Sequence, residues 1–145
     1  MEPRDTRILL VEDNPDDVEL TLKAFEKHNL ANEIVVARDG EEALDILFQR
    51  DEERTGLRPD LILLDLKLPK VDGLEVLRQV KNDSRTKVIP IVILTSSKEE
   101  NDIINGYQLG VNSYLRKPVN FEKFTEVVMQ IGLYWLLLNE LPTKQ

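Results

Sequence analysis

The sequence has no cysteine, a single histidine and no long run of apolar residues. Without cysteine, the chain can form neither disulfide bonds nor thiolate zinc sites, and it lacks a cysteine nucleophile. No apolar run approaches the roughly 20 residues that a membrane-spanning helix needs. The first residues, 1–5, carry mixed charges and lack the apolar region of a signal peptide. These absences predict a cytoplasmic protein with no membrane partner.

Positive charge is also scarce, because 27 Asp and Glu residues outnumber 19 Lys and Arg residues and give a formal net charge of −8 at pH 7. Phosphate backbones and anionic membrane surfaces both attract Lys and Arg. The excess of negative charge therefore argues against nucleic acid and against a membrane surface as partners. A length of 145 residues, with 41% hydrophobic and 32% charged residues, predicts one globular domain over residues 1–145.

Short apolar runs alternate with longer amphipathic stretches, which predicts an α/β domain. Apolar runs rich in branched residues predict strands at 7–11, 34–37, 61–64, 91–94 and 113–115. Apolar residues at helical spacing predict helices at 16–28, 40–49, 73–81, 99–109 and 121–138. The helix at 99–109 is the weaker one, and its Ile103, Ile104 and Tyr107 are expected to face inward. The charged segment 50–59 is predicted to be a surface loop. This alternation implies right-handed crossovers and a parallel sheet that helices cover on both faces.

Polar residues end the predicted strands, at the edge where sheets of this kind bind ligands. These residues are Glu12, Asp13, Asp65, Thr95, Ser96 and Lys117. Each could be a solvated loop residue when taken alone, but their joint placement favours a site. Carboxylates in one crevice repel each other unless a hard divalent cation such as Mg²⁺ offsets their charge. A lysine and a hydroxyl opposite the metal would hold a tetrahedral anion, and a carboxylate there can attack phosphorus and form an aspartyl phosphate.

With these residues, the chain resembles the bacterial two-component response regulators over nearly all of its length. The motifs that carry the resemblance are Glu12-Asp13, Asp65 with Pro69 and Gly73 downstream, Thr95-Ser96, and Tyr114-x-x-Lys117-Pro118. The resemblance implies a flavodoxin-like (βα)5 fold, a doubly wound five-stranded parallel sheet in the order 2-1-3-4-5. It also implies a single receiver domain with an extended C-terminal helix and no output domain.

The resemblance assigns the phosphoacceptor and the metal ligands. Asp65 would accept the phosphoryl group and bind Mg²⁺ directly together with Asp13, while Glu12 would act through a water molecule. The backbone carbonyl of Lys67 would be a further metal ligand. The peptide bond before Pro118 would be cis, a geometry that is essentially confined to proline.

The resemblance also assigns the groups that bind and sense the phosphoryl group. Thr95 and Lys117 would contact its oxygens, with Ser96 and Lys67 as further phosphoryl-binding residues. The Lys67 side chain departs from the neutral or small polar residue that many relatives carry at this position. As the hydroxyl of Thr95 moves toward the phosphoryl group, the ring of Tyr114 would enter the vacated space, and the face around the fourth helix and fifth strand would change.

The resemblance narrows to the small single-domain regulators that pair with bacterial phytochrome histidine kinases. The features behind it are segment 12–17, the charged loop before Pro59, and the late Tyr134-Trp135-Leu136. A sensor histidine kinase is therefore the expected partner, and the narrower resemblance implies a phytochrome. The only histidine of the chain, His28, is predicted at a helix end, where a structural role is favoured. The phosphodonor histidine would then belong to a partner, or a small phosphodonor would replace it.

The apolar run from Ile131 to Leu138 admits two interpretations. The end of the last helix could belong to the core, or Tyr134, Trp135 and Leu138 could form the surface of a homodimer or of a complex with another partner. Aromatic residues are enriched at the centre of interfaces, which favours the second interpretation. The resemblance agrees with it, because receivers commonly pair through the fourth helix, the fifth strand and the fifth helix.

The expected function is a phosphoacceptor switch of a two-component phosphorelay, which changes its protein–protein contacts and catalyses only its own phosphorylation and dephosphorylation. The alternative is an Mg²⁺-dependent phosphohydrolase of the haloacid dehalogenase type, but that family has a second Asp two residues after the nucleophile, where this chain has Lys67. A dinucleotide-binding domain is disfavoured because Asn14-Pro15-Asp16 replaces the glycine-rich turn. A structural dimer with a decayed site is a third possibility, against which the intact set of site residues argues.

Overall fold

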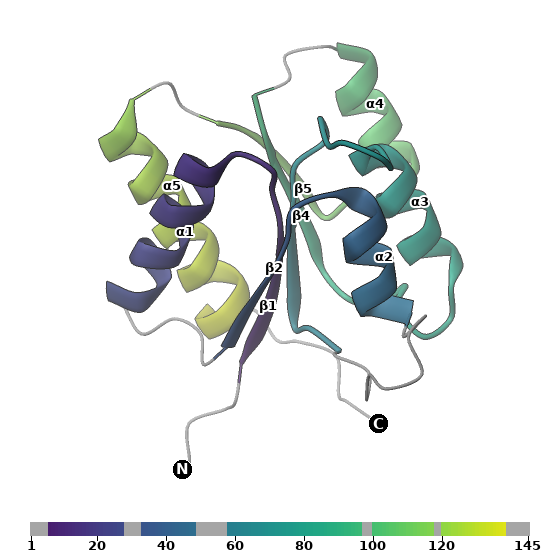
Figure 1. Cartoon of the computed structure of the whole chain (residues 1–145), viewed down its shortest axis with the longest axis horizontal. Helices are drawn as coiled ribbons and strands as arrows, with labels where there is room; N and C mark the ends of the chain where they lie inside the picture. The colour runs from purple at the N-terminus through teal and green to yellow at the C-terminus, as the bar shows by residue number, and fades with distance from the viewer. Residues whose placement is uncertain (1–5, 28–32, 49–57, 97–99, 118–119, 139–145) are drawn as a thin grey trace.

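The computed structural model describes residues 6–27, 33–48, 58–96, 100–117 and 120–138, and these form a parallel sheet with helices on both faces (Figure 1). The strands are β1 (Arg7–Val11), β2 (Glu33–Ala37), β3 (Leu61–Leu64), β4 (Ile91–Thr95) and β5 (Ser113–Arg116). The helices are α1 (Pro15–Lys27), α2 (Gly40–Phe48), α3 (Gly73–Asn82), α4 (Glu100–Gln108) and α5 (Phe121–Gly132), followed by the π-helical segment η1 (Leu133–Leu138).

The strand order is β2-β1-β3-β4-β5, and all four strand pairs are parallel. This is the predicted flavodoxin-like order. Apart from Arg7 at the start of β1 and Thr95 at the end of β4, the three central strands consist of apolar residues because the sheet is covered on both faces, and every residue of β3 and β4 is buried. The strand order reverses between β1 and β3, which places the ligand-binding crevice of such folds beyond the carboxyl ends of these two strands.

Two hydrophobic clusters, one on each face, hold the helices to the sheet. Along β1, Ile8 and Leu10 belong to the cluster that α1 and α5 cover, while Leu9 and Val11 belong to the cluster under α2 and α3. This alternation follows from the two-residue period of a strand. Figure 1 shows α1 and α5 together on one side of the sheet, and α2, α3 and α4 on the other.

All ten predicted elements are present, with boundaries that differ from the prediction by a few residues, but the inward face of α4 was predicted wrongly. Ile104 and Tyr107 are 45% and 54% exposed, and Ile103 is only partly buried. The buried positions of α4 are Asp102 and Gly106, one turn apart, and Gly106 packs over Ile93 and Tyr114 of the sheet.

The predicted last helix is α-helical only to Gly132. There the backbone N–H of Leu133 donates to the carbonyls of Met129 and Gln130, and the wider turn of η1 follows. His28, most of the loop at 50–59, Pro118 and the side chain of Leu138 lie outside the described residues. Within the described ranges, no helix combines the length and the apolar character needed to cross a membrane.

Candidate functional site

The register of the sheet brings the strand-end carboxylates together. Val11 of β1 pairs with Leu64 of β3, so the next residues, Glu12 and Asp65, leave the sheet side by side. The backbone N–H of Glu12 donates to the carbonyl of Ala37 at 3.0 Å, and that of Asp65 donates to the carbonyl of Val11 at 3.0 Å. These bonds continue the ladder of backbone hydrogen bonds between neighbouring strands by one residue beyond β1 and β3. Both side chains are therefore held on rigid backbone, and both residues are buried.

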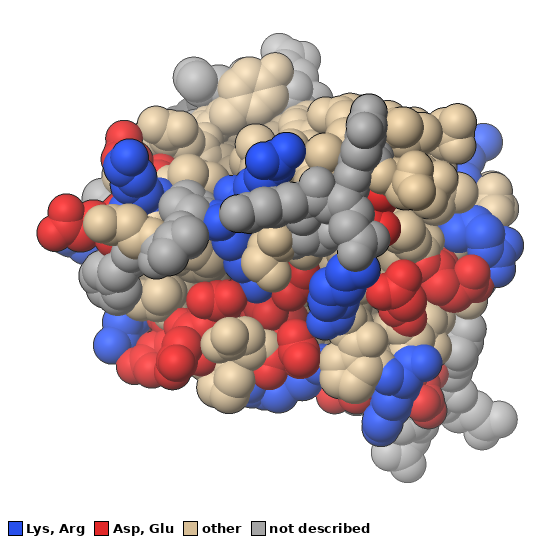
Figure 2. Space-filling model, turned by 90° about the horizontal axis from the view of Figure 1, so that it is seen from above, with Lys and Arg blue, Asp and Glu red and all other residues tan. Residues whose placement is uncertain are grey.

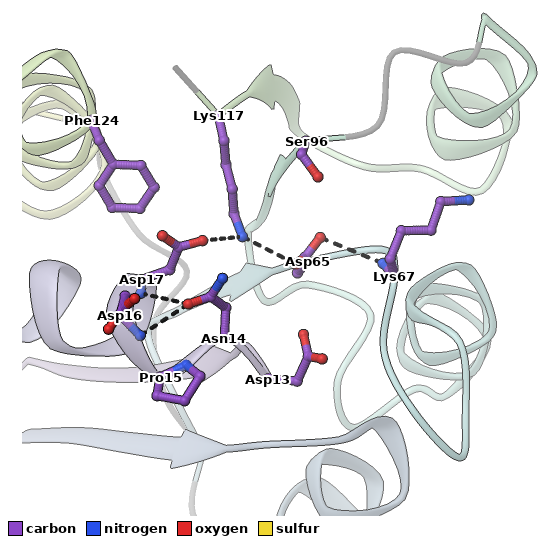
Figure 3. Close-up of a pocket in the computed structure, with 10 residues that line it drawn as sticks. All are labelled: Asp13, Asn14, Pro15, Asp16, Asp17, Asp65, Lys67, Ser96, Lys117 and Phe124. Carbon is purple, nitrogen blue, oxygen red and sulfur yellow. Dashed lines mark hydrogen bonds and ion pairs between the residues drawn. The ribbon is translucent and has the colours of Figure 1, made fainter. Parts of the chain in front are cut away.

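Lys117 follows β5, and its backbone N–H donates to the carbonyl of Thr95 at 2.7 Å. Its ammonium group lies among three carboxylates, of which Figure 3 shows those of Asp17 and Asp65. The distances from its Nζ are 2.5 Å to Glu12, 2.8 Å to Asp17 and 3.1 Å to Asp65. An ammonium group has three N–H donors, so these three carboxylates can engage all of them.

The two oxygens of Asp65 have different partners. Oδ2 accepts the bond from Lys117, whereas Oδ1 accepts one from the hydroxyl of Thr95 at 2.6 Å and one from the backbone N–H of Lys67 at 3.4 Å. The side chain of Lys67 extends away from Asp65 (Figure 3), and its ammonium lies 3.3 Å from Asp102 of α4. Lys67 therefore faces the site with its backbone, and its charge lies elsewhere.

Three carboxylates at the strand ends form a group that fits a divalent cation. Glu12, Asp13 and Asp65 each offer one oxygen, and these oxygens lie within 4.8 Å of one another. Seen from this end, the molecule has a cluster of Asp and Glu side chains in the middle of the face (Figure 2). Hard cations such as Mg²⁺ prefer oxygen ligands of this kind, and they would offset the repulsion between the carboxylates.

The environment shifts the pKa values of the buried site residues in different directions. Burial raises the pKa of Glu12 to about 7, although the hydrogen bond from Lys117 opposes this effect. Burial also acts to raise the pKa of Asp65, but the bonds from Thr95 and Lys117 outweigh it and hold this pKa below its usual value. Burial acts to lower the pKa of Lys117, but its bonds to Asp17 and Glu12 outweigh this and raise it. Asp65 is therefore ionised and Lys117 charged at neutral pH.

Asp17 is a site residue that the sequence analysis missed. The side chain of Asn14 accepts hydrogen bonds from the backbone N–H groups of Asp16 and Asp17, at 2.9 and 3.2 Å, and so begins α1 directly after β1. This start directs Asp17 into an open cavity of about 700 Å³, which Lys117 and Phe124 also line. The sequence signal that could have indicated Asp17 is the acidic first turn of α1, which comes directly after the site residues at the end of β1.

The remaining predicted residues lie around this centre or away from it. Ser96 lines the same cavity and is exposed. Tyr114 is partly buried and packs against the cluster under α2 and α3. Tyr134 and Trp135 stack edge to face in η1, with ring centroids 5.2 Å apart. Tyr134 is 54% exposed, while Trp135 packs against the cluster under α1 and α5, so the apolar C-terminal run contributes both to the core and to the surface.

Comparison with known proteins gives a consistent set of relatives. The family model of the response regulator receiver domain matches residues 8–129. The response regulator Rcp1 of Synechocystis sp. is 42% identical over 135 residues, covering 93% of this chain and 92% of Rcp1. The Mn²⁺-bound form of Rcp1 superposes with a TM-score of 0.91 at 41% identity, over 95% of this chain and 99% of that one.

Two further solved structures cover almost the whole chain. The phosphorylated cyanobacterial phytochrome response regulator RcpA has a TM-score of 0.93 at 43% identity, and the match covers 97% of this chain and all of RcpA. The bacteriophytochrome response regulator AtBRR is 56% identical with a TM-score of 0.72, and the match covers 95% of this chain and all of AtBRR. The likeness therefore extends over nearly the whole chain.

Proposed function

The chain belongs to the response regulator receiver domain family, and from this premise we propose that it is a phosphoacceptor switch that carries a phosphoryl group on Asp65. Receiver domains are signalling modules of two-component systems rather than typical enzymes. The observation that supports Asp65 as the acceptor is its position: a buried carboxylate between the hydroxyl of Thr95 and the ammonium of Lys117, with its pKa held low.

The proposed reaction is the attack of a carboxylate oxygen of Asp65 on the phosphorus of a partner's phosphohistidine. A P–O bond forms while the N–P bond breaks, and the electron pair of that bond stays on the imidazole nitrogen. The ammonium of Lys117, the hydroxyl of Thr95 and the backbone N–H of Lys67 already point at Asp65. These donors, together with Ser96 on the cavity wall, would bind the phosphoryl oxygens and stabilise their developing charge.

The residues that would hold a resident Mg²⁺ are Glu12, Asp13 and Asp65, with the backbone carbonyl of Lys67 as a further ligand. The proximity of the three carboxylate oxygens supports this assignment, as does the Mn²⁺-bound form of the relative Rcp1. When bound, the cation would neutralise charge on the transferring group. The chain's own contribution is to hold the carboxylates of Glu12 and Asp65 together by burial and by the continued backbone ladder, with the exposed Asp13 beside them.

The proposed partner is a sensor histidine kinase, and the relatives named for phytochromes favour a phytochrome kinase. The switch would act through Thr95 and Tyr114. The hydroxyl of Thr95 already donates to Asp65, so it would turn from this oxygen to a phosphoryl oxygen, and Tyr114 could then move toward β4. The ring of Tyr114 in β5 lies close to Gly106 of α4, since a Cβ built on Gly106 would be 3.5 Å from it. Movement of this ring would therefore change the contact between β5 and α4.

Acetyl phosphate, a small phosphodonor, tests the proposal directly. Intact-mass spectrometry should detect the gain of one phosphoryl group in the wild type with Mg²⁺, and no gain with a chelator or in Asp65→Ala. Asp72→Ala is a matched control, because Asp72 is an exposed carboxylate before α3 whose side chain makes no capping bond; it should gain the group normally. An equal gain in Asp65→Ala would overturn the proposal, and rapid turnover of a generic phosphatase substrate would favour a phosphohydrolase.

A further inference from the structure

We infer that Asp17 of α1 is a positioning residue for phosphoryl transfer, which holds the ammonium of Lys117 at the place where the phosphoryl group will form. This inference rests on the proposed function. Asp17 lies outside the three carboxylates that would bind the metal, yet its Oδ2 is 2.8 Å from Nζ of Lys117. Figure 3 shows the lysine side chain extending toward Asp65, with the carboxylate of Asp17 beside its end.

The three partners of Lys117 differ in what else they must do. Asp65 would become the phosphorylated residue, and Glu12 would take part in metal binding. Both would therefore weaken or change their bonds to the ammonium during the reaction. Asp17 has neither duty. It is the partner that can keep Lys117 in place while the N–H group that now points to Asp65 turns to a phosphoryl oxygen.

Asp17 is itself well fixed, which a positioning residue requires. Its backbone N–H is bound by the side chain of Asn14, and its carbonyl accepts the hydroxyl of Thr21 at 2.7 Å. The next residue, Val18, is buried against the sheet. Lysine has a long flexible side chain, so its charge occupies one place only where partners order it. Asp17 can order Lys117 because it belongs to α1, which packs on the hydrophobic core.

The carboxylate of Asp17 has two opposite effects on the reaction with acetyl phosphate. In that reaction, a P–O bond to Asp65 forms, the bond between phosphorus and the acetyl oxygen breaks, and acetate leaves with the electron pair. By holding Lys117, Asp17 raises the rate at saturating donor. By its negative charge, it disfavours the approach of an anionic donor and raises the half-saturating concentration. The two effects fall on different kinetic quantities, so substitutions can separate them.

Three variants separate the effect of holding Lys117 in place from the effect of the negative charge of Asp17. Asp17→Ala removes both, Asp17→Asn keeps a carbonyl that can accept the lysine N–H, and Asp16→Asn removes the same charge one residue earlier. Asp16 is the matched control because it is exposed and its carboxylate has no hydrogen bond or ion pair to Lys117 among those described. Initial rates are measured by quenched flow and intact-mass spectrometry over a range of acetyl phosphate concentrations, with circular dichroism to establish that each variant is folded.

The saturating rate should fall on the order of tenfold in Asp17→Ala, should be largely restored in Asp17→Asn, and should not change in Asp16→Asn. The half-saturating concentration should fall about threefold in all three variants, since each removes one charge near the donor. A wild-type saturating rate in Asp17→Ala, or an equal loss in Asp16→Asn, would overturn the inference.

A second measurement keeps the test independent of the proposed function. In ¹⁵N-labelled protein, the ammonium protons of a hydrogen-bonded lysine exchange slowly with water, and Lys117→Arg identifies the signal of Lys117. This signal should be present in the wild type and in Asp16→Asn but lost in Asp17→Ala. If the wild type is not phosphorylated, the proposed function fails. If the signal persists in Asp17→Ala, the positioning role fails, whatever the result of phosphorylation.

Discussion

At the scale of single residues, the chemistry of the site depends on how donors are distributed around Asp65. Burial alone would favour its neutral form, which is a poor nucleophile. Charge-assisted bonds from Lys117 and the bond from Thr95 reverse this preference. The pKa of Glu12, which is similarly buried, is raised to about 7 because burial outweighs the hydrogen bond from Lys117. Two neighbouring carboxylates of similar burial therefore differ in protonation at neutral pH.

The raised pKa of Glu12 predicts that Mg²⁺ binding depends on pH. Below its pKa of about 7, Glu12 holds a proton in the metal-free protein, and a cation that needs the carboxylate must displace it. Affinity for Mg²⁺ should therefore rise as pH rises, by about tenfold from roughly pH 6 to pH 8 for one displaced proton. Titration calorimetry at both pH values measures the affinity. The dependence of the binding enthalpy on the ionisation enthalpy of the buffer gives the number of protons released.

Glu12→Gln is the control for this linkage, because glutamine carries no titrating proton and has nearly the same shape. Its Mg²⁺ affinity should be weaker than that of the wild type at about pH 8 and nearly constant down to about pH 6. A wild-type affinity that does not change with pH, or a pH dependence that persists in Glu12→Gln, would contradict the assignment of the proton to Glu12.

The sequence predicted the residues at the strand ends because their position follows from the strand pattern alone. Glu12 and Asp65 come directly after apolar runs, Lys117 follows the predicted strand 113–115 with one residue between, and parallel strands end at one edge. The partners of the two lysines could not be predicted in this way. Asp17 meets Lys117 only through the direction of α1, and Asp102 meets Lys67 only through the rotation of α4 about its axis. Both depend on packing that a single sequence does not encode locally.

At the scale of elements, the loop between β3 and α3 is shaped by close backbone contacts. The backbone N–H of Gly73 donates to the carbonyl of Leu66 at 2.9 Å, which folds the loop back onto the end of β3. Lys70 adopts a φ of 68°, a left-handed conformation that non-glycine residues rarely adopt. Strained backbone of this kind often occurs at functional sites. The loop places Lys67 beside Asp65, so its shape determines where the phosphoryl-binding backbone lies.

Substitution of Gly73 should therefore affect both stability and the site. A Cβ at Gly73 would lie 2.3 Å from the carbonyl oxygen of Asp65 and 2.6 Å from Cα of Leu66, and both atoms belong to the backbone. Gly73→Ala should lower the free energy of unfolding by about 2–3 kcal/mol and slow the phosphorylation of Asp65. Urea denaturation measures the first effect, and the acetyl phosphate assay measures the second.

Gly106→Ala is a matched control inside a helix. The atoms nearest to a Cβ at Gly106 are side-chain atoms at 3.4 Å or more, which is ordinary contact. Alanine is favoured over glycine in a helix interior by about 1 kcal/mol, so this variant should be as stable as the wild type or slightly more stable. If Gly73→Ala behaved like Gly106→Ala, the close approach of the loop to Asp65 would not constrain the site.

The rotation of α4 shows why its surface was not predicted. A helical pattern with apolar residues at 103, 104 and 107 has an apparent apolar face, yet the buried stripe runs through Asp102 and Gly106. Gly106 permits close approach to the sheet, and Asp102 pairs with Lys67. With the helix in this rotation, Ile104 and Tyr107 face outward. The local apolar pattern therefore does not determine which side of α4 packs on the sheet.

At the scale of the whole molecule, the exposed apolar side chains are distributed unevenly. Ile104 and Tyr107 on α4 and Leu115 on β5 lie on neighbouring elements at the β5 edge of the sheet. Leu133 and Tyr134 on η1 continue the helix α5, which covers the other face. Exposed apolar patches on soluble domains often mark interaction sites. We propose that α4, β5 and α5 with η1 form the surface through which two copies of this chain associate.

This proposal predicts that tyrosines on both parts of the surface contribute to self-association. Tyr107 and Tyr134 are each 54% exposed, so their loss should leave the core intact while removing aromatic contact area from an interface. Tyr107→Ser and Tyr134→Ser should each weaken the dimer about tenfold or more, as measured by sedimentation equilibrium. Val88→Ser is the control, because Val88 is 45% exposed but lies before β4, at the opposite end of the strand from Thr95. A wild type that remains monomeric, or a dimer that Val88→Ser weakens as much as the tyrosine variants do, would exclude this surface as the interface.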